Sequence, residues 1–307
     1  MATLTTDNTS NIKPVYVCKA SIQGRRPHQE DRIFCCNIIN EFKKQFLCSC
    51  LNKCSRLSLF LVCDGHAGAR AAQFCCDNII KKFWEATASI GVNSGTIDIL
   101  NIESLKLNLK SILELTVTML DKDYLCRAKG TKEKDGSCIT AALLLNNHFF
   151  FLNVGDCRAM RVNKGSINQI TRDHQPGLNK KEDKRVLDAG GKISDSRNDK
   201  RVLAKGMRMA ITRAIGDRLL KPSIIICNPD LFYVQVTPDL QFIILCSDGI
   251  TSRMTNKHVL ETLKKSKMKM KGMQTKTNRI NYAKDLVDFS YSKGSMDNIS
   301  ALVLEML

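Results

Sequence analysis

The chain has 307 residues, of which 43% are hydrophobic and 25% are charged, a composition typical of a globular protein rather than of a disordered or fibrous one. No stretch is apolar over the length that a membrane-spanning helix needs, so the sequence predicts no membrane span. The formal net charge of +17 favours acidic or phosphorylated partners, nucleic acid or anionic membranes through long-range attraction.

Residues 1–13 are rich in Thr, Ser and Asn and lack the apolar core of a signal peptide. We therefore expect a disordered N-terminal tail, followed by a single domain over residues 14–307 that no linker or repeat divides. The 14 cysteines are spread along the chain without a secretory signal, which favours free thiols in a reducing compartment. The sequence thus predicts a cytoplasmic or nuclear protein.

Apolar runs and turn residues predict the secondary structure. The expected strands are residues 15–21, 33–39, 59–63, 137–145, 148–154, 159–162, 224–227, 231–236, 241–246 and 299–304. The expected helices are residues 71–84, 104–127 and 181–189, one capped by Thr255, and a last one marked by apolar residues between 280 and 287. Tight turns join most strands, and strands and helices do not alternate regularly. This favours an α+β fold, with antiparallel sheet and helices packed outside it.

An aspartate, a glycine and a histidine follow the apolar run 59–63, as Asp64-Gly65-His66. A buried strand that ends in this way places an oxygen ligand and a titratable base at the rim of a core. On a single occurrence, a strand closed by an Asp-Gly turn is the simpler interpretation.

The same arrangement recurs along the chain. Asp156 and Asp248 each follow an apolar run, and Asp297 precedes the last one. Each acid alone is most simply a turn residue, but strands that share a sheet edge would bring the acids together. Their mutual repulsion would then need neutralising, and oxygen-only ligands favour Mg²⁺ or Mn²⁺ over zinc.

Two such ions that share a carboxylate can lower the pKa of a bridging water and hold a phosphoryl group. Arg26 offers a bidentate fork for the remaining phosphate oxygens. His66 could donate the proton to the leaving group, since an unperturbed imidazole has a pKa of about 6.5. Glu30 and Asp31 could orient metal-bound waters by accepting their hydrogen bonds.

These residues belong to a series of short motifs. The motifs occupy residues 24–31, 63–68, 135–141, 154–159, 173–176, 189–191, 212–217, 246–250 and 295–300. In their composition and order the chain resembles the metal-dependent Ser/Thr phosphatases of the protein phosphatase 2C family. The resemblance covers nearly the whole chain, from Gly24 to the C-terminus.

The resemblance implies a central antiparallel β-sandwich flanked by helices in α-β-β-α layers, with two Mg²⁺ or Mn²⁺ ions at one end. It implies hydrolysis of phosphoserine and phosphothreonine in proteins by attack of a hydroxide that bridges the metals. By motif position, Asp64 would bridge the two ions and Gly65 would give its carbonyl to one of them. Asp248 and Asp297 would hold the other ion.

The resemblance also assigns the remaining roles. Arg26 would bind the substrate phosphate, although Arg25 could compete, and His66 would be the general acid, with Glu30 and Asp31 behind the metals. Asp156 falls where the family often binds a third, weaker metal. The family commonly has an acid four residues after Asp248, and this chain has Ser252 there. Third-metal binding is therefore an open question at this stage.

Two other classes of function stay open. One is a catalytically silent domain that keeps the fold and binds phosphoproteins. The other is a zinc or nucleic-acid protein built on Cys48, Cys50, Cys54 and the lysine-rich residues 264–276, but no histidine lies near the cysteines and no aromatics interleave with the lysines. We expect a monomer without nucleic acid. Single histidines elsewhere are expected to be surface or turn residues, namely His28, His148, His174 and His258.

Overall fold

The computed structural model describes residues 14–38, 54–94, 101–194, 196, 199–271 and 279–307. The tail 1–13 and the cysteines Cys48 and Cys50 lie outside these residues, as do residues 272–276 of the lysine-rich segment 264–276. No helix within the described ranges combines the length and the apolarity needed to cross a membrane.

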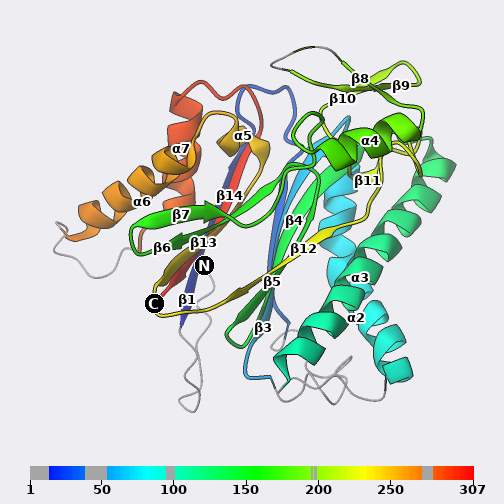
Figure 1. Ribbon diagram of the computed structural model, residues 1–307. Coiled ribbons are helices and arrows are strands. Elements are labelled where there is room, and N and C mark those ends of the chain that lie inside the picture. The colour runs from blue at the N-terminus through cyan, green and yellow to red at the C-terminus, as the bar shows by residue number, and fades with distance from the viewer. Residues whose placement is uncertain (1–13, 39–53, 95–100, 195, 197–198, 272–278) are drawn as a thin grey trace.

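Two antiparallel sheets lie face to face at the centre of the molecule (Figure 1). The first has the order β1 (Val15–Ile22), β14 (Ile299–Met306), β13 (Leu240–Cys246), β6 (Arg158–Asn163) and β7 (Ser166–Gln169). The second has the order β12 (Asp230–Gln235), β5 (His148–Val154), β4 (Gly136–Leu145), β3 (Leu57–His66) and β2 (Arg32–Asn37), and β11 (Ile215–Gly216) pairs with β4. The expected antiparallel β-sandwich is confirmed.

Helices cover the outer face of each sheet. The second sheet packs against α2 (Arg70–Ser94) and α3 (Ile102–Thr131), and the first packs against α5 (Asp248–Thr251), α6 (Asn256–Lys271) and α7 (Tyr282–Ser292). At one end of the sandwich lie α4 (Lys180–Asp188) and a small sheet of β8 (Lys192–Ile193), β9 (Val202–Ala204) and β10 (Met207–Met209). These are the α-β-β-α layers that the resemblance implied.

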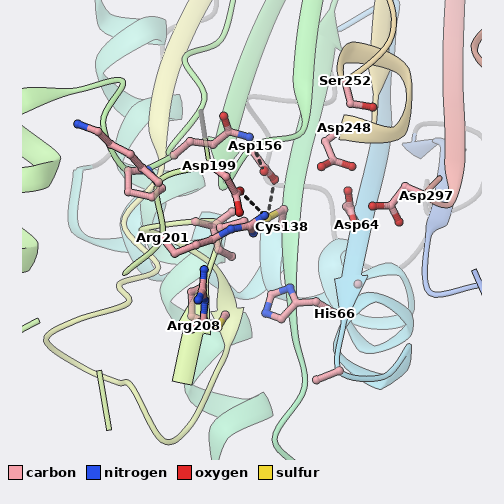
Figure 2. Close-up of a pocket in the computed structure, with 18 of the residues that line it drawn as sticks. Asp64, His66, Cys138, Asp156, Asp199, Arg201, Arg208, Asp248, Ser252 and Asp297 are labelled. Atoms are coloured by element: carbon pink, nitrogen blue, oxygen red, sulfur yellow. Dashed lines mark hydrogen bonds and ion pairs between the residues drawn. The ribbon is translucent and has the colours of Figure 1, made fainter. Parts of the chain in front are cut away.

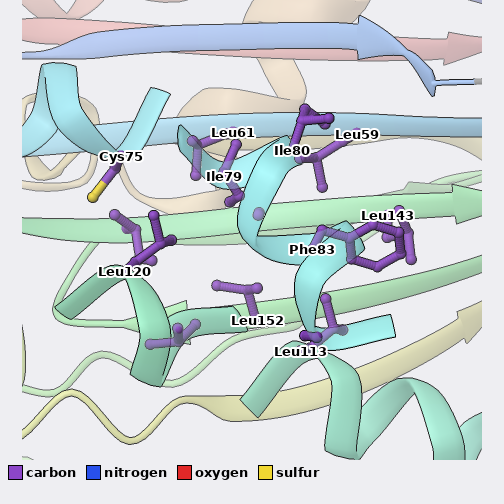
Figure 3. Close-up of a cluster of buried hydrophobic side chains, with 14 of the residues drawn as sticks. Leu59, Leu61, Cys75, Ile79, Ile80, Phe83, Leu113, Leu120, Leu143 and Leu152 are labelled. Carbon is purple, nitrogen blue, oxygen red and sulfur yellow. The ribbon is translucent and has the colours of Figure 1, made fainter. Parts of the chain in front are cut away.

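The environment of β3 explains why residues 59–63 are continuously apolar. Leu59 and Leu61 face the helices α2 and α3 (Figure 3), whereas Phe60 and Val62 pack between the two sheets. Because side chains alternate along a strand and both faces are covered, no polar residue is tolerated here. By the same alternation, Asp64 and His66 fall on the inter-sheet side, where the sandwich ends.

The strand runs further than expected. It continues through Asp64 to His66, and these residues pair with Cys138 and Gly136 of β4. Asp64-Gly65 is therefore part of the ladder and not a turn, so the simpler interpretation of this motif was wrong. The extra pairs fix the direction of the Asp64 and His66 side chains.

One expected strand is absent from the described structure. Residues 224–227 form a turn, in which only Ile226 makes an isolated bridge, to Arg213. Ile224 and Ile225 are buried in the inter-sheet core, which explains why this segment is apolar without being a strand. Conversely, the sequence did not predict the strands β8, β9 and β10. Each has only two or three residues, too few to give a periodic signal.

The expected helices are confirmed, with different ends. α2 and α3 extend beyond residues 71–84 and 104–127, and Asn101 caps α3 by accepting hydrogen bonds from two backbone N–H groups. Thr255 lies directly before α6, where its Oγ1 accepts a hydrogen bond from the N–H of His258 at 3.4 Å. Lys264 and Lys265 are exposed on α6, as expected of a solvated helix face.

Candidate active site

A pocket of about 860 Å³ opens at the end of the sandwich beside the small sheet (Figure 2). The structure brings nearly all the predicted site residues together in its wall: Arg26, Glu30, Asp64, Gly65, His66, Asp156, Asp248 and Asp297. Asp31 is buried instead of lining the pocket. Residues from opposite ends of the sequence thus form one site.

The acids reach the pocket from both sheets. Asp64 lies at the end of β3 and Asp156 just after β5, in the second sheet. Asp248 follows β13 and Asp297 precedes β14, in the first sheet. Figure 2 shows the carboxylates of Asp64, Asp248 and Asp297 directed toward one another. The pattern of acids at strand ends therefore marks a real convergence.

The acids raise one another's pKa values. Burial, and then the charges of neighbouring carboxylates including Asp31 and Asp248, hold the pKa of Asp64 well above its usual range. Burial and the charges of Asp156 and Asp297 do the same to the pKa of Asp248. Burial raises the pKa of Asp31 to about 6, against the opposing effect of hydrogen bonds from serine side chains. This cluster carries more negative charge than the surrounding protein compensates.

The donor set fits Mg²⁺ or Mn²⁺, because these ions prefer carboxylate and carbonyl oxygens. Asp31 adds a second observation: its Oδ2 accepts a hydrogen bond from Ser247 Oγ at 2.8 Å, while its buried Oδ1 has no partner within the described structure. No three His, Cys, Asp or Glu side chains in the described part already have the spacing of a formed metal site. Ions of this kind usually keep several waters, so few protein ligands are needed to hold them.

Gly65 allows a close approach of two segments. A Cβ at this position would lie 2.6 Å from the carbonyl oxygen of Glu30 and 3.2 Å from that of Gly68. Only a residue without a side chain lets β3 lie this close to the segment that carries Glu30 and Asp31. Gly65 thus places its own carbonyl group and Glu30 at one site.

The two neighbouring arginines have different environments. Arg26 lines the pocket, and its Nη2 lies 2.7 Å from Oδ2 of Asp297. Arg25 points to α7, where its Nη1 donates to the carbonyl of Ser295 at 2.6 Å and its guanidinium lies 4.5 Å from the ring centroid of Tyr291. This geometry favours Arg26 over Arg25 as the phosphate-binding residue.

Asn298 holds the Arg26 loop in place, a role that its sequence did not reveal. Its Nδ2 donates to the carbonyls of Gln23 and His28 at 2.7 and 2.8 Å, and its Oδ1 accepts from the N–H of Glu30 at 2.8 Å. The loop between β1 and β2 is thereby fixed to the start of β14. The Asp-Asn pair before the last strand was the available signal.

His66 is held by Asp217. Its Nε2 lies 2.9 Å from both carboxylate oxygens of Asp217. Burial opposes protonation of the imidazole, but the Asp217 carboxylate outweighs it and raises the pKa of His66. Asp217 adopts a φ of +52°, a region that favours glycine, so the chain tolerates backbone strain here. This contact gives Asp217 a hydrogen-bonding role in positioning His66.

His174 corrects the prediction of surface or turn histidines. It is buried, and its Nδ1 accepts a hydrogen bond from the N–H of Gly155 at 3.0 Å. Its Nε2 lies 3.4 Å from Oδ2 of Asp230. His174 therefore supports the turn that precedes Asp156, a contact between segments that the local sequence does not reveal.

A comparison with known families identifies the chain. A family model described as protein phosphatase 2C matches residues 17–299. The chain belongs to the protein phosphatase 2C family. The family is metal-dependent in general, in agreement with the carboxylate cluster.

Among curated relatives, the probable protein phosphatase 2C 7 of Oryza sativa subsp. japonica is 29% identical over 253 residues, covering 82% of this chain and 59% of that protein. The probable protein phosphatase 2C 30 of Arabidopsis thaliana is 27% identical over 287 residues, covering 92% of this chain and 64% of that protein. The chain thus spans about three fifths of the length of these relatives.

Solved structures agree on the fold. A serine-threonine phosphatase 2C from Toxoplasma gondii superposes with a TM-score of 0.78 at 20% identity, covering 98% of this chain and 97% of that one. A C. elegans sex determining protein gives a TM-score of 0.76 at 20% identity, covering 98% of this chain and 66% of that one. At this identity the likeness concerns the fold alone.

The third-metal position of the protein phosphatase 2C family is altered in this chain. Asp156 is buried, and its Oδ1 accepts a hydrogen bond from Cys138 Sγ at 3.2 Å while its Oδ2 accepts one from Gln175 Nε2 at 2.9 Å. Ser252 lines the pocket where the family commonly has a second acid. Both oxygens of Asp156 thus have a protein donor and no acid stands at position 252, so third-metal binding at Asp156 stays a prediction.

Proposed function

We propose that this chain is a metal-dependent protein phosphatase that hydrolyses phosphoserine and phosphothreonine in proteins, with residues 14–307 as one catalytic domain. The observation that carries the proposal is the convergence of Asp64, Asp248 and Asp297 from two sheets on a pocket that also holds Arg26 and His66. Family membership supports the same reaction.

The site would hold two Mg²⁺ or Mn²⁺ ions. Asp64 would contact both, the Gly65 carbonyl would complete one, and Asp248 and Asp297 would hold the other. When bound, the ions would neutralise the carboxylates and lower the pKa of a water shared between them. Glu30 would accept hydrogen bonds from waters in the pocket, and Asp31, which is buried behind the pocket wall, would accept one from an ion-bound water through its unpartnered Oδ1.

Arg26 binds and orients the substrate phosphate in this proposal. Its side chain is 54% exposed, and its ion pair with Asp297 uses Nη2 alone, so further N–H donors remain for phosphate oxygens. A guanidinium can bind two oxygens of one phosphate with parallel hydrogen bonds. Release of Asp297 from Arg26 would make both groups available at once.

His66 delivers the proton to the leaving serine or threonine oxygen. Its Nε2–H donates to Asp217, so the proton leaves from Nδ1. A water oxygen attacks phosphorus and forms the new P–O bond, while the P–O bond to the serine or threonine oxygen breaks. That oxygen takes the Nδ1 proton, and His66 is left neutral. The Asp217 carboxylate keeps the imidazole protonated before this step by raising its pKa.

The test is an assay on purified, metal-stripped protein with a phosphoserine peptide. Added Mn²⁺ or Mg²⁺ should restore release of inorganic phosphate, and Asp64→Asn should stay inactive at every metal concentration. Equal activity in the presence of a chelator would overturn the metal-dependent mechanism. Peptide binding without turnover at saturating Mn²⁺ would favour a silent phosphoprotein-binding domain instead. The monomeric state and the cytoplasmic or nuclear location stay predictions.

A further inference from the structure

The wall of the pocket that faces Asp64, Asp248 and Asp297 is basic. Lys200, Arg201 and Arg208 line the pocket from the small sheet and the segment before β9. Figure 2 shows Arg201 and Arg208 on the far side of the pocket from Asp248 and Asp297. We call Lys200 and Arg208 the basic wall, since the two differ from Arg201 in their contacts.

Arg201 is already paired, because its Nη2 lies 2.5 Å from Oδ1 of Asp199. Lys200 and Arg208 are both exposed, and neither has an ion-pair or hydrogen-bond partner among the residues that the structure describes. Two uncompensated cations beside a pocket attract an anion that enters it. This basic wall therefore has binding capacity that the rest of the site does not use.

Both residues are supported by ordered segments. Arg208 lies at the centre of β10, opposite Leu203 of β9. A Cβ at Gly177 would lie 2.3 Å from Cδ of Lys200, so the lysine stem rests on the backbone of Gly177. The basic wall is thus part of the folded pocket.

The basic wall is separate from the residues proposed to bind the reacting phosphate. In the proposed function, the reacting phosphate contacts Arg26 and the ions that Asp64, Asp248 and Asp297 would hold. A peptide that places its phosphorylated residue at these groups would lay neighbouring side chains across the pocket. An anion on one of those neighbours would meet Lys200 and Arg208.

We propose that Lys200 and Arg208 select phosphoprotein segments that carry a second anionic side chain, a carboxylate or a second phosphate, close to the phosphorylated serine or threonine. This proposal rests on the proposed phosphatase function and names the substrate class of the same pocket. Arg208 offers a planar fork to the second anion, and Lys200 adds a point charge.

The experiment compares short phosphoserine peptides whose flanking residues are Gln, Glu, Lys or a second phosphoserine. With wild-type protein and Mn²⁺, we expect kcat/KM to be about 3–10-fold higher for the Glu peptide than for the Gln peptide, mainly through KM. Arg208→Gln and Lys200→Gln should each bring this ratio toward one, and added salt should do the same. Lys192→Gln removes an equal charge from β8 outside the pocket, and it should keep the wild-type ratio.

The same peptide kinetics distinguish a carboxylate from a second phosphate as the preferred second anion. A larger preference for the doubly phosphorylated peptide identifies phosphate, and a larger preference for the Glu peptide identifies a carboxylate. Equal kcat/KM for the Glu, doubly phosphorylated and Gln peptides would overturn the proposal, as would variants that lower all three values in the same proportion.

Failure of the phosphatase function would look different. If the wild type turned over no peptide, fluorescence anisotropy would give the Glu-to-Gln ratio of dissociation constants instead. A preference for Glu that Arg208→Gln abolishes would then support the basic wall while the proposed reaction fails. No preference in binding would overturn both.

Discussion

Two groups of buried acids in this protein have opposite electrostatics. On α4, Glu182 accepts hydrogen bonds from Arg213 at 2.6 and 3.0 Å and from Arg185 at 3.1 Å. Burial opposes its ionisation, but these arginines outweigh it and hold the pKa of Glu182 at about 2. At the end of the sandwich, Asp64 is surrounded by other acids, and burial and their charges hold its pKa well above the usual range.

The difference separates structural acids from acids that need an added ligand. A buried carboxylate between two arginines is satisfied by the protein itself, so it contributes to the folded state at neutral pH. A buried cluster of carboxylates without enough cations is costly at the same pH, and a divalent ion would remove the cost. The charge of Glu182 is therefore balanced by the protein's own arginines, whereas the acids around Asp64 need an added cation.

The largest expected effect comes from Asp64→Asn, which should lower activity without lowering stability. We expect kcat/KM to fall by about 10³-fold or more, roughly 4 kcal/mol of transition-state stabilisation, because the residue that would contact both ions loses its charge. The free energy of unfolding of the metal-free protein should stay equal or rise, because one of the repelling charges is gone. Phosphopeptide kinetics and urea denaturation at pH 7 measure the two effects. Asp239→Asn, at an exposed ion pair with Lys164, is the control that should change neither.

The opposite result is expected for Glu182→Gln. This change leaves Arg213 and Arg185 without their carboxylate and should lower the free energy of unfolding by about 3–5 kcal/mol at pH 7. The pKa of Glu182 is lowered from 4.5 to about 2, so its stabilisation is present above pH 4.5 and is lost as the pH falls toward 2. Urea denaturation should therefore show the two proteins converging in acid. A constant difference at all pH values would contradict this account.

Metal addition sharpens the comparison through its pH dependence. The pKa of Asp31 is raised from 3.8 to about 6, so the stability that its neutral form gives the metal-free protein is complete below pH 3.8 and is lost as the pH rises through 6. We expect Mn²⁺ to raise the melting temperature by about 2–6 °C at pH 7 and by much less at pH 4. Differential scanning fluorimetry of wild type and Asp31→Asn tests this. The metal-free variant should melt higher than wild type at pH 7 and equally at pH 4.

The smallest predicted effect concerns Asp217→Asn. Without the carboxylate charge the pKa of His66 falls, so less of the imidazole is protonated at neutral and alkaline pH. The alkaline limb of the kcat profile should move to lower pH by about 0.5–1 unit, with about 3–10-fold lower kcat at pH 8. Recovery of activity at lower pH would separate this effect from misfolding. An unshifted profile would argue against His66 as the proton donor.

The sequence allowed the layers and the acid cluster to be predicted because both follow local rules. Continuous apolar runs such as 59–63 indicate strands covered on both faces, and an acid directly after such a run lies at a sheet end. The motif order then connected Asp64 with Asp248 and Asp297, although no local pattern could show that their strands face each other across a sandwich.

The rest depends on contacts between distant segments. Glu182 and Arg213 meet only after folding, as do His66 and Asp217, and neither pair has a periodic signal. Ile224 and Ile225 are apolar because they fill the inter-sheet core, and this burial was mistaken for a strand. Nothing in the local sequence indicates that Lys200 and Arg208 lie opposite the acids across the pocket.

The pairing of β14 determines when the site can exist. β14 lies between β1 and β13, and Arg26 and Asp297 are separated by 271 residues in the chain. During synthesis β1 emerges early, yet its neighbour in the first sheet emerges after all the other described strands. A nascent chain without β14 therefore lacks Asp297, the hydrogen bonds from Asn298 to the Arg26 loop and the strand that joins β1 to β13. Because β14 pairs with β1 on one side and with β13 on the other, Arg26 and Asp297 can meet only after these long-range strand pairings have formed.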